Sequence, residues 1–219
     1  KISAVDDFLE KDCAKKSLKI LEKNPQAGFV FSMPSMYFFK QKQIKKYNLR
    51  ISIRPIYFSP KEFKKLVSKK IFKIYSNTIF FDTDKFNSKN LFDKKFGYMS
   101  DLLNSYYMGF TYGVCFVPEH LAHYGIHEKQ ISQNVKNKSQ ENLNAIILLK
   151  KEENIFYKSY ISSSLAYDIS PLDLIKLLFT KNREIFTLKV FYRSIIFSLW
   201  TKIKFIVPSY LVSFILRYF

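Results

Sequence analysis

The stretch YGVCFVPEHLAHYGIH, residues 112–127, decides how this chain is interpreted, together with Met99-Ser100-Asp101 shortly before it. The apolar run from Tyr112 to Val117 predicts a buried strand. Pro118 is expected to end that strand, because proline has no N–H to donate to a neighbouring strand. The residues that follow, including three histidines, are then expected on a loop. We expect the fold to bring this loop, Asp101 and the distant acid pair Asp6-Asp7 into one cleft.

The composition indicates an ordered and strongly basic chain. Of its 219 residues, 47% are hydrophobic, which excludes a disordered chain and allows one domain with or without an appendage. The chain carries 36 Lys and Arg against 18 Asp and Glu, a net charge of +18. This excess favours anionic partners such as nucleic acid, acidic lipid or nucleotide phosphates. Abundant Lys, Asn, Ile, Phe and Tyr with scarce Gly is also typical of an AT-rich genome, so the charge alone selects no partner.

The start of the chain and its cysteines give two further expectations. The chain begins at Lys1 without a recognisable secretory leader, and we expect a processed or truncated product that lacks part of its domain upstream. Cys13 and Cys115 form no CxxC pair, so neither a zinc ribbon nor a disulfide framework is indicated. A reducing cytoplasm fits this cysteine usage best.

Helix and strand signals alternate over residues 1–134, which predicts an α/β fold with a mixed sheet flanked by helices. A helix is expected over 12–23, with Asp12 as its N-cap and Asn24-Pro25 as its end. Ser59-Pro60-Lys61-Glu62 has the pattern of a capping box at a second helix start.

A third helix is expected to begin at Ser100 and to end at Gly109, because glycine is the usual residue just past a helix. Buried strands are predicted at 27–32 and 78–81 from their short apolar runs.

From residue 135 onward the pattern is helical, which predicts a helical extension over 135–219. Helices are expected over 139–165 and from Ser170-Pro171 onward. The longest uncharged run of the tail, Phe205 to Leu216, has 12 residues, whereas a helix that spans a bilayer needs roughly 20. The tail is therefore expected either to lie on the surface of an anionic membrane or to cover the core of its own domain. Both interpretations stay open.

Asp6 and Asp7 are the first candidates for chemistry. They follow the apolar residues 2–5, which predicts an acid pair at the carboxyl end of a strand, where ligands bind in α/β sheets. Carboxylates suit hard cations such as Mg²⁺ or Mn²⁺, which in turn bridge phosphate oxygens. The simpler interpretation of such a pair is a helix cap or a solvated turn.

His120, His123 and His127 fall within eight residues. On a helix this spacing would place them on one face and suggest a zinc site. Pro118 and Gly125 favour a loop instead, and no cysteine lies near. We therefore expect a functional role for His127 and none for the other two.

Two blocks of this sequence resemble the family 2 glycosyltransferases. The first is Asp6-Asp7-Phe8-Leu9, followed by Asn24-Pro25 and the strand at 27–32. The second runs from Phe92-Asp93 and Gly97 through Ser100-Asp101 and a helix to FVPEHLAHYGIH, residues 116–127. The blocks match in order and internal spacing, and the resemblance covers roughly residues 2–132.

The resemblance implies a GT-A fold, truncated at its N-terminus, that transfers a sugar from a nucleotide diphosphate, UDP being favoured, to a saccharide or lipid-linked acceptor. It implies that Asp7 holds Mn²⁺ or Mg²⁺ on the diphosphate, that Asp6 assists at the metal or the ribose, and that His127 approaches the metal from a closing loop. Asp101 would be the catalytic base that removes the acceptor proton, with inversion at the sugar. A cytoplasmic protein, peripheral at the inner face of the membrane, is expected.

The chain departs from the family pattern at three points. Ala4 stands where many members have an additional acid, and Gly125 stands where an arginine is frequent. The first nucleotide-binding half of the family is absent upstream of the acid pair, so the chain as given is not expected to bind donor normally.

Two competing interpretations stay open. The chain could be a basic module that binds an acidic membrane or nucleic acid, with an incidental acid pair, although no nucleic-acid-binding motif is present and nucleic acid is not expected as a partner. It could also be an inactive fragment that supplies only an acceptor half and a docking tail.

Overall fold

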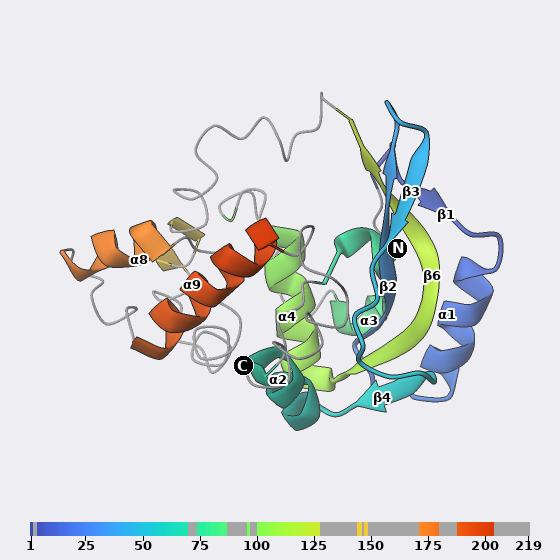
Figure 1. Ribbon diagram of the computed structural model, residues 1–219. Coiled ribbons are helices and arrows are strands. Elements are labelled where there is room, and N and C mark those ends of the chain that lie inside the picture. Colours follow the sequence, from blue (N-terminus) through green and yellow to red (C-terminus); the bar gives the residue numbers. More distant parts are fainter. Residues whose placement is uncertain are drawn as a thin grey trace. The chain divides into compact units, whose positions relative to one another are not determined.

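The computed structural model describes residues 1, 4–69, 74–86, 96, 100–127, 144–145, 147–148, 171–179 and 188–203 (Figure 1). Its contacts divide the chain into two compact units. The first comprises residues 1–63 and 74–136, and the second comprises 64–73 and 137–219. Each unit is described by itself. The expected motif around Phe92-Asp93 and Gly97, most of the expected helix over 139–165 and the run from Phe205 to Leu216 lie outside the described residues.

The first unit contains a mixed, open sheet of six strands flanked by helices, which confirms the predicted α/β class. Two long strands, β2 (Phe29–Phe38) and β6 (Val114–Ile126), lie side by side and parallel at its centre. The other strands are short and antiparallel to their neighbours: β1 (Phe8–Leu9), β3 (Gln43–Lys46), β4 (Ile56–Phe58) and β5 (Ile79–Phe81).

The central pair changes its neighbours halfway along. Over the lower half of the pair, Phe29–Ser32 beside Val114–Val117, β4 pairs with β6 and β5 pairs with β2. The pairing then shifts by several residues between Ser32 and Pro34. Over the upper half, Pro34–Phe38 beside Ala122–Ile126, β1 pairs with β6 and β3 pairs with β2. The irregularity at residues 118–121 therefore divides the sheet into two zones.

Pro118 lies within this irregularity and does not end the strand, so that prediction was wrong. Residues 118–121 have no partner in the register of β2, which passes from Val117 directly to Ala122. A residue without an N–H is tolerated in a strand at such a bulge because no ladder hydrogen bond is lost. The segment that carries the three histidines is consequently part of β6, except for His127 just beyond it, and not a loop.

Helix α1 (Cys13–Glu22) covers one face of the lower half. Its buried side chains Cys13 and Ile20 form a cluster with Val30, Cys115 and Val117. The helix confirms the one predicted at 12–23, and Asp12 is its N-cap residue, although the Asp12 side chain makes no capping hydrogen bond. The backbone carbonyl of Asp12 accepts the N–H of Lys16 instead.

The opposite face is covered by aromatic side chains and by α4 (Ser100–Tyr112). The Phe29 ring lies edge-on to Phe63, with centroids 6.3 Å apart, and Phe31 lies 5.0 Å from Phe116. These four rings are at most 1% exposed. Helix α2 (Pro60–Lys69) begins at the predicted capping box: the Glu62 carboxylate accepts the Ser59 N–H at 2.8 Å, and the Ser59 hydroxyl accepts the Glu62 N–H at 3.4 Å.

Gly109 does not end α4, which continues to Tyr112 and stops at Gly113. Gly113 has φ +77°, the left-handed conformation that favours glycine after a helix. Gly109 serves a packing purpose instead, because a Cβ there would lie 2.3 Å from the Phe63 ring. The remaining short elements of this unit are α3 (Thr83–Phe86) and the 3₁₀ turn Ser76–Thr78.

The described residues of the second unit are helical. Helices α8 (Pro171–Leu178) and α9 (Leu188–Ile203) contact each other, and Leu174, Val190 and Ser194 are buried. The helix start predicted at Ser170-Pro171 is confirmed by α8. Within the described parts of the chain, no helix has both the length and the apolar character needed to cross a membrane.

Candidate functional site

Asp6 and His127, which are 121 positions apart in the chain, meet at the upper end of the sheet. The Asp6 carboxylate Oδ2 lies 2.9 Å from His127 Nε2. Both side chains are partly exposed, 24% for Asp6 and 35% for His127. His127 directly follows β6, and Asp6 lies in a turn that precedes β1. Two of the predicted site residues are therefore brought together at the surface.

Asp7 stands beside this pair. Its Oδ1 accepts the Gly125 N–H at 3.3 Å and its Oδ2 accepts the Ala4 N–H at 3.1 Å. The Asp7 N–H in turn donates to the Ala4 carbonyl at 3.2 Å, which closes a turn. The acid pair lies in and just after a turn that precedes β1, and Ala4 and Val5, the described residues directly before it, are not in a strand, contrary to the prediction. Val5 accordingly is fully exposed and contributes nothing to a core.

Gly125 makes this arrangement possible. A Cβ at position 125 would lie 2.2 Å from the Asp6 carbonyl oxygen and 3.0 Å from the Phe39 ring. Backbone at that distance cannot yield like a flexible side chain, so only glycine lets the acid segment cross β6. Glycine at position 125 thus has a steric reason in this chain.

The short pairing of β1 with β6 fixes how the segment that carries Asp6 and Asp7 lies against the segment that carries His127. Phe8 pairs with His123 and Leu9 with Ala122, and the Glu10 N–H donates to the Leu121 carbonyl at 3.0 Å. The acid pair precedes β1 by one or two residues, and His127 follows the paired segment of β6. Antiparallel pairing therefore carries Asp6 and Asp7 toward the end of β6 at which His127 lies.

Sequence reasoning missed a polar network behind this pairing. His123, which received no role, is 6% exposed and is held between two partners. Its Nδ1 lies 2.7 Å from the Ser35 hydroxyl and its Nε2 lies 2.8 Å from Glu10 Oε1. Ser35 also donates to the Ala122 carbonyl at 2.9 Å. The network joins β1, β6 and β2, and no local signal reveals it because Glu10 and His123 are 113 positions apart.

Aromatic rings border the site. Phe8, Tyr37 and Phe39 lie with centroids 5.0–5.7 Å apart, and Phe39 lies edge-on to the His127 imidazole at 5.8 Å. Edge-to-face packing of this kind orients rings and adds modest stability. The imidazole is therefore positioned from two sides, by the Asp6 carboxylate and by the Phe39 ring.

Asp101, the expected catalytic base, lies in the first turn of α4 and is partly buried. Its Oδ1 accepts the Leu102 N–H at 2.7 Å, and its carbonyl accepts the Ser105 hydroxyl at 2.8 Å. Among the contacts of the described residues, no hydrogen bond or ion pair joins Asp101 to Asp6, Asp7 or His127. A carboxylate in this position is also stabilised by the helix dipole.

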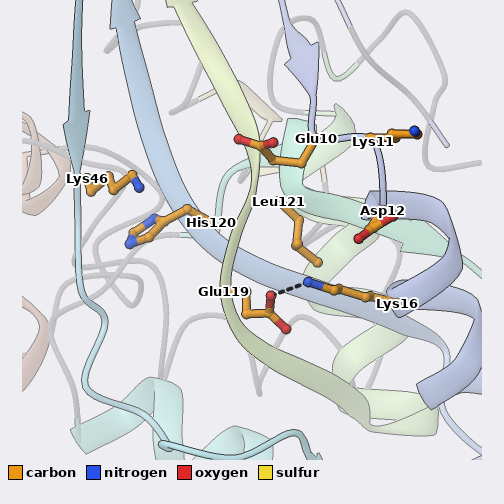
Figure 2. A pocket seen from close by; sticks show the side chains of 8 residues that line it. All are labelled: Glu10, Lys11, Asp12, Lys16, Lys46, Glu119, His120 and Leu121. Atoms are coloured by element: carbon orange, nitrogen blue, oxygen red, sulfur yellow. Dashed lines mark hydrogen bonds and ion pairs between the residues drawn. The ribbon is translucent and has the colours of Figure 1, made fainter.

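A mixed-charge cavity of about 430 Å³ opens beside the network, between the start of α1 and β6 (Figure 2). Lys16 and Glu119 form an ion pair at 2.5 Å along its wall. His120 lies on the far side near Lys46, and its Nδ1 is 3.1 Å from the Pro34 carbonyl. Burial lowers the pKa of His120 below its usual value, and the nearby Lys46 charge adds to the fall. Glu10, Lys11, Asp12 and Leu121 complete the lining.

The described residues contain no group of three or more His, Cys, Asp or Glu side chains arranged to hold a metal ion. Asp6 Oδ2 and His127 Nε2 lie 2.9 Å apart, and Asp7 Oδ1 accepts the N–H of Gly125, two residues before His127. Cations that bridge nucleotide phosphates commonly take only one or two protein carboxylates, because phosphate and water supply the other oxygens.

Comparison with known proteins assigns no family. A scan against protein-family models finds no match to this chain, and a search of curated proteins finds no match either.

Proposed function

We propose that this chain is the C-terminal part of a metal-dependent glycosyltransferase domain of family 2 with a GT-A fold. It transfers a sugar from a nucleotide diphosphate, most simply a UDP-sugar, to a glycan or a lipid-linked acceptor. One observation carries the proposal: Asp6, Asp7 and His127, from the two sequence blocks that resemble this family, gather at one end of a mixed α/β sheet.

Each residue receives a role from its chemistry. Asp6, Asp7 and His127 would hold Mn²⁺ or Mg²⁺, which would supply the positive charge that stabilises a diphosphate leaving group. Gly125 supports the site by allowing the acid segment to cross β6. The network of Glu10, His123 and Ser35 holds β1, and with it the acid pair, in register.

Asp101 acts as the base in this proposal. Its carboxylate takes the proton of the acceptor hydroxyl while that oxygen forms a bond to the anomeric carbon. The bond from the anomeric carbon to the phosphate oxygen breaks, and its electron pair leaves with the nucleotide diphosphate. A single displacement of this kind inverts the configuration of the sugar.

Nucleotide binding tests the proposal. We expect calorimetry to detect binding of UDP, GDP or dTDP that requires Mn²⁺, weaker than that of a glycosyltransferase with both nucleotide-binding halves, and we expect the Asp7→Ala variant to weaken it further by at least about tenfold. Asp84→Ala removes an exposed carboxylate of α3 and serves as the matched control. Equal affinities of Asp7→Ala and the wild type, or binding that ignores Mn²⁺, would contradict the metal–diphosphate assignment.

Catalysis requires a separate test of Asp101. In the presence of a donor that is hydrolysed or transferred, Asp101→Asn is expected to lower kcat by about 10²–10⁴-fold and to leave the affinity for nucleotide unchanged. A loss of nucleotide affinity in this variant would instead indicate that Asp101 supports the fold or the donor site.

A further inference from the structure

The hairpin formed by β2 and β3, residues 38–46, is a strongly basic exposed feature of the first unit. It carries Lys40, Lys42, Lys45 and Lys46, and the sequence contains no Asp or Glu between Glu22 and Glu62. All residues of β3 and of the connecting turn are exposed. β3 is an edge strand, and its turn projects at the upper end of the sheet (Figure 1).

Apolar side chains accompany these charges. Phe39 is 40% exposed and Ile44 is 46% exposed, and Lys45 lies over the Phe38 ring at 5.1 Å. Exposed aliphatic and aromatic groups among lysines match the interface of a bilayer, where lysine stems lie along apolar surface and the ammonium groups reach the lipid headgroups.

The backbone of the turn supplies an independent observation. Lys42 has φ +49°, in the left-handed region that glycine or asparagine occupies at low cost in a hairpin turn. A lysine there keeps a positive charge at a position where its conformation is unfavourable. Lysine on an edge strand also prevents pairing with other chains, which accounts for Lys45 and Lys46 but not for the lysines of the turn.

We propose that the β2–β3 hairpin is a docking surface for an anionic lipid membrane. Lys40 and Lys42 on the turn, with Lys45 and Lys46 on β3, meet the anionic headgroups, while Ile44 and the exposed part of Phe39 lie against the interface. Nucleic acid is less well matched, because stacking on bases needs open ring faces and Phe39 is already packed against Phe8, Tyr37 and His127.

The described carboxylates near the hairpin have partners of their own. Asp6 and Asp7 lie at its base, where they accept hydrogen bonds from backbone N–H groups or contact His127. Glu10 and Glu119 line the cavity that Lys46 also lines, and they contact His123 and Lys16 respectively.

The docking surface does not depend on the proposed transferase activity. If both hold, the site at Asp6 and His127 lies beside the membrane, because Phe39 contacts His127 and its N–H donates to the Ile126 carbonyl at 3.2 Å. A lipid-linked acceptor would then be favoured over a soluble glycan.

Vesicle flotation of the full chain tests the proposal without nucleotide or metal. The probe is vesicles of phosphatidylcholine in which about a third of the lipid is phosphatidylglycerol, compared with phosphatidylcholine alone. We expect binding to the anionic vesicles only, weakened by salt. The variant K42Q/K45Q/K46Q is expected to lose on the order of a hundredfold in partitioning, because each lysine near an anionic surface contributes about fivefold.

Matched variants separate local docking from general charge. K15Q/K19Q/K23Q removes three exposed lysines from α1 and its end, and it is expected to reduce binding much less. Ile44→Ser is expected to weaken binding severalfold, whereas Ile53→Ser, at a position 92% exposed outside the hairpin, is expected to have little effect. Circular dichroism checks that every variant folds.

Three results would overturn the proposal. Equal losses in the two triple-lysine variants would show that only net charge matters. Retention of vesicle binding by K42Q/K45Q/K46Q, with a loss of RNA binding, would assign the hairpin to nucleic acid. Self-association of that variant with unchanged vesicle binding would assign the lysines to protection of the sheet edge.

Discussion

The two halves of the central strand pair have different tasks although they belong to the same two strands. In the lower half, Phe29, Phe31 and Phe116 are at most 1% exposed and pack between helices and rings. In the upper half, the corresponding positions carry Ser35, Tyr37, His123 and Gly125, and hydrogen bonds replace apolar contacts. The irregular segment at residues 118–121 lies between them.

This difference suggests a division between stability and function within one sheet. The apolar lower half has strand neighbours and helices on its faces, so its free energy comes from burial. The upper half is held by hydrogen bonds and partly exposed aromatic contacts, which tolerate the polar side chains that a ligand site needs. A change of neighbours at the bulge lets each zone have its own edge strands.

The largest expected effect comes from truncating a core ring of the lower half. Phe116→Ala removes a fully buried ring that lies 5.0 Å from Phe31, and it should lower the free energy of unfolding by about 3–5 kcal/mol. Tyr37→Ala in the upper half should cost about 1–2 kcal/mol, since its aromatic neighbours are partly exposed. Urea unfolding of both variants measures the contrast. Similar losses of unfolding free energy in the two variants would contradict the proposed division between a stabilising lower half and a functional upper half.

A pair of glycine substitutions sharpens the comparison. Gly109→Ala places a Cβ 2.3 Å from the Phe63 ring and should destabilise the core by about 1–3 kcal/mol. Gly125→Ala drives a Cβ into the Asp6 carbonyl, so it should displace the acid pair and weaken Mn²⁺ binding with little change in global stability. Urea unfolding and Mn²⁺ titration of both variants test this assignment. A loss of global stability in Gly125→Ala, together with a loss of Mn²⁺ binding in Gly109→Ala, would contradict it.

Much of this fold could be predicted from sequence where the signals are local. The capping box at Ser59 and Glu62 and the helix near residues 12–23 depend on neighbouring residues, and the structure bears them out. Gly109 and Pro118 were misleading, because glycine and proline usually end elements. Their roles here depend on Phe63 and on the register of β2, which lie far away in the chain.

The candidate site was predictable only in part, for the same reason. Asp6, Asp7 and His127 could be selected from two sequence blocks, and the structure brings them together. The partners of His123 could not be selected, since Glu10 and Ser35 come from two other strands or their ends. Long-range pairing, and not composition, decides which histidine is buried.

The network at His123 gives a smaller effect that belongs to the upper half. His123→Leu removes the contacts with Ser35 and Glu10, and it should cost about 1–2 kcal/mol, near the value of two hydrogen bonds. Glu10→Gln should cost less, because that carboxylate is half exposed. Thermal unfolding of both variants checks the order. A larger loss in Glu10→Gln would show that the ion pair, and not the buried imidazole, holds β1.

The smallest expected difference between the two halves is in how alkaline pH lowers the free energy of unfolding. Burial raises the pKa of the Cys115 thiol in the lower half from 9.0 to about 12. The thiol of the unfolded chain ionises at a lower pH than the buried thiol, so the free energy of unfolding is unaffected by this group below pH 9. Above pH 9 the free energy of unfolding falls, by about 1 kcal/mol between pH 9 and pH 10. Burial raises the pKa of Tyr75, beside Tyr124 of the upper half, to about 12. The stability that depends on the neutral Tyr75 phenol is therefore lost only above pH 10.

Urea unfolding across this pH range measures both slopes. Cys115→Ala should reduce the decline that starts near pH 9, and Tyr75→Phe should reduce only the part above pH 10. A decline that is the same in Cys115→Ala and in the wild type between pH 9 and 10 would exclude the thiol as its source.

The metal–diphosphate site is the central claim, and the three histidines of the chain provide its most direct test. Mn²⁺ relaxes nearby nuclei, so NMR of histidine-labelled protein can be recorded during titration with Mn²⁺ and UDP. We predict that the His127 resonances broaden first, that those of His120 in the mixed-charge cavity change least, and that Asp7→Ala abolishes the difference. Broadening of His120 before His127, or equal broadening of all three, would contradict a cation site at Asp6, Asp7 and His127.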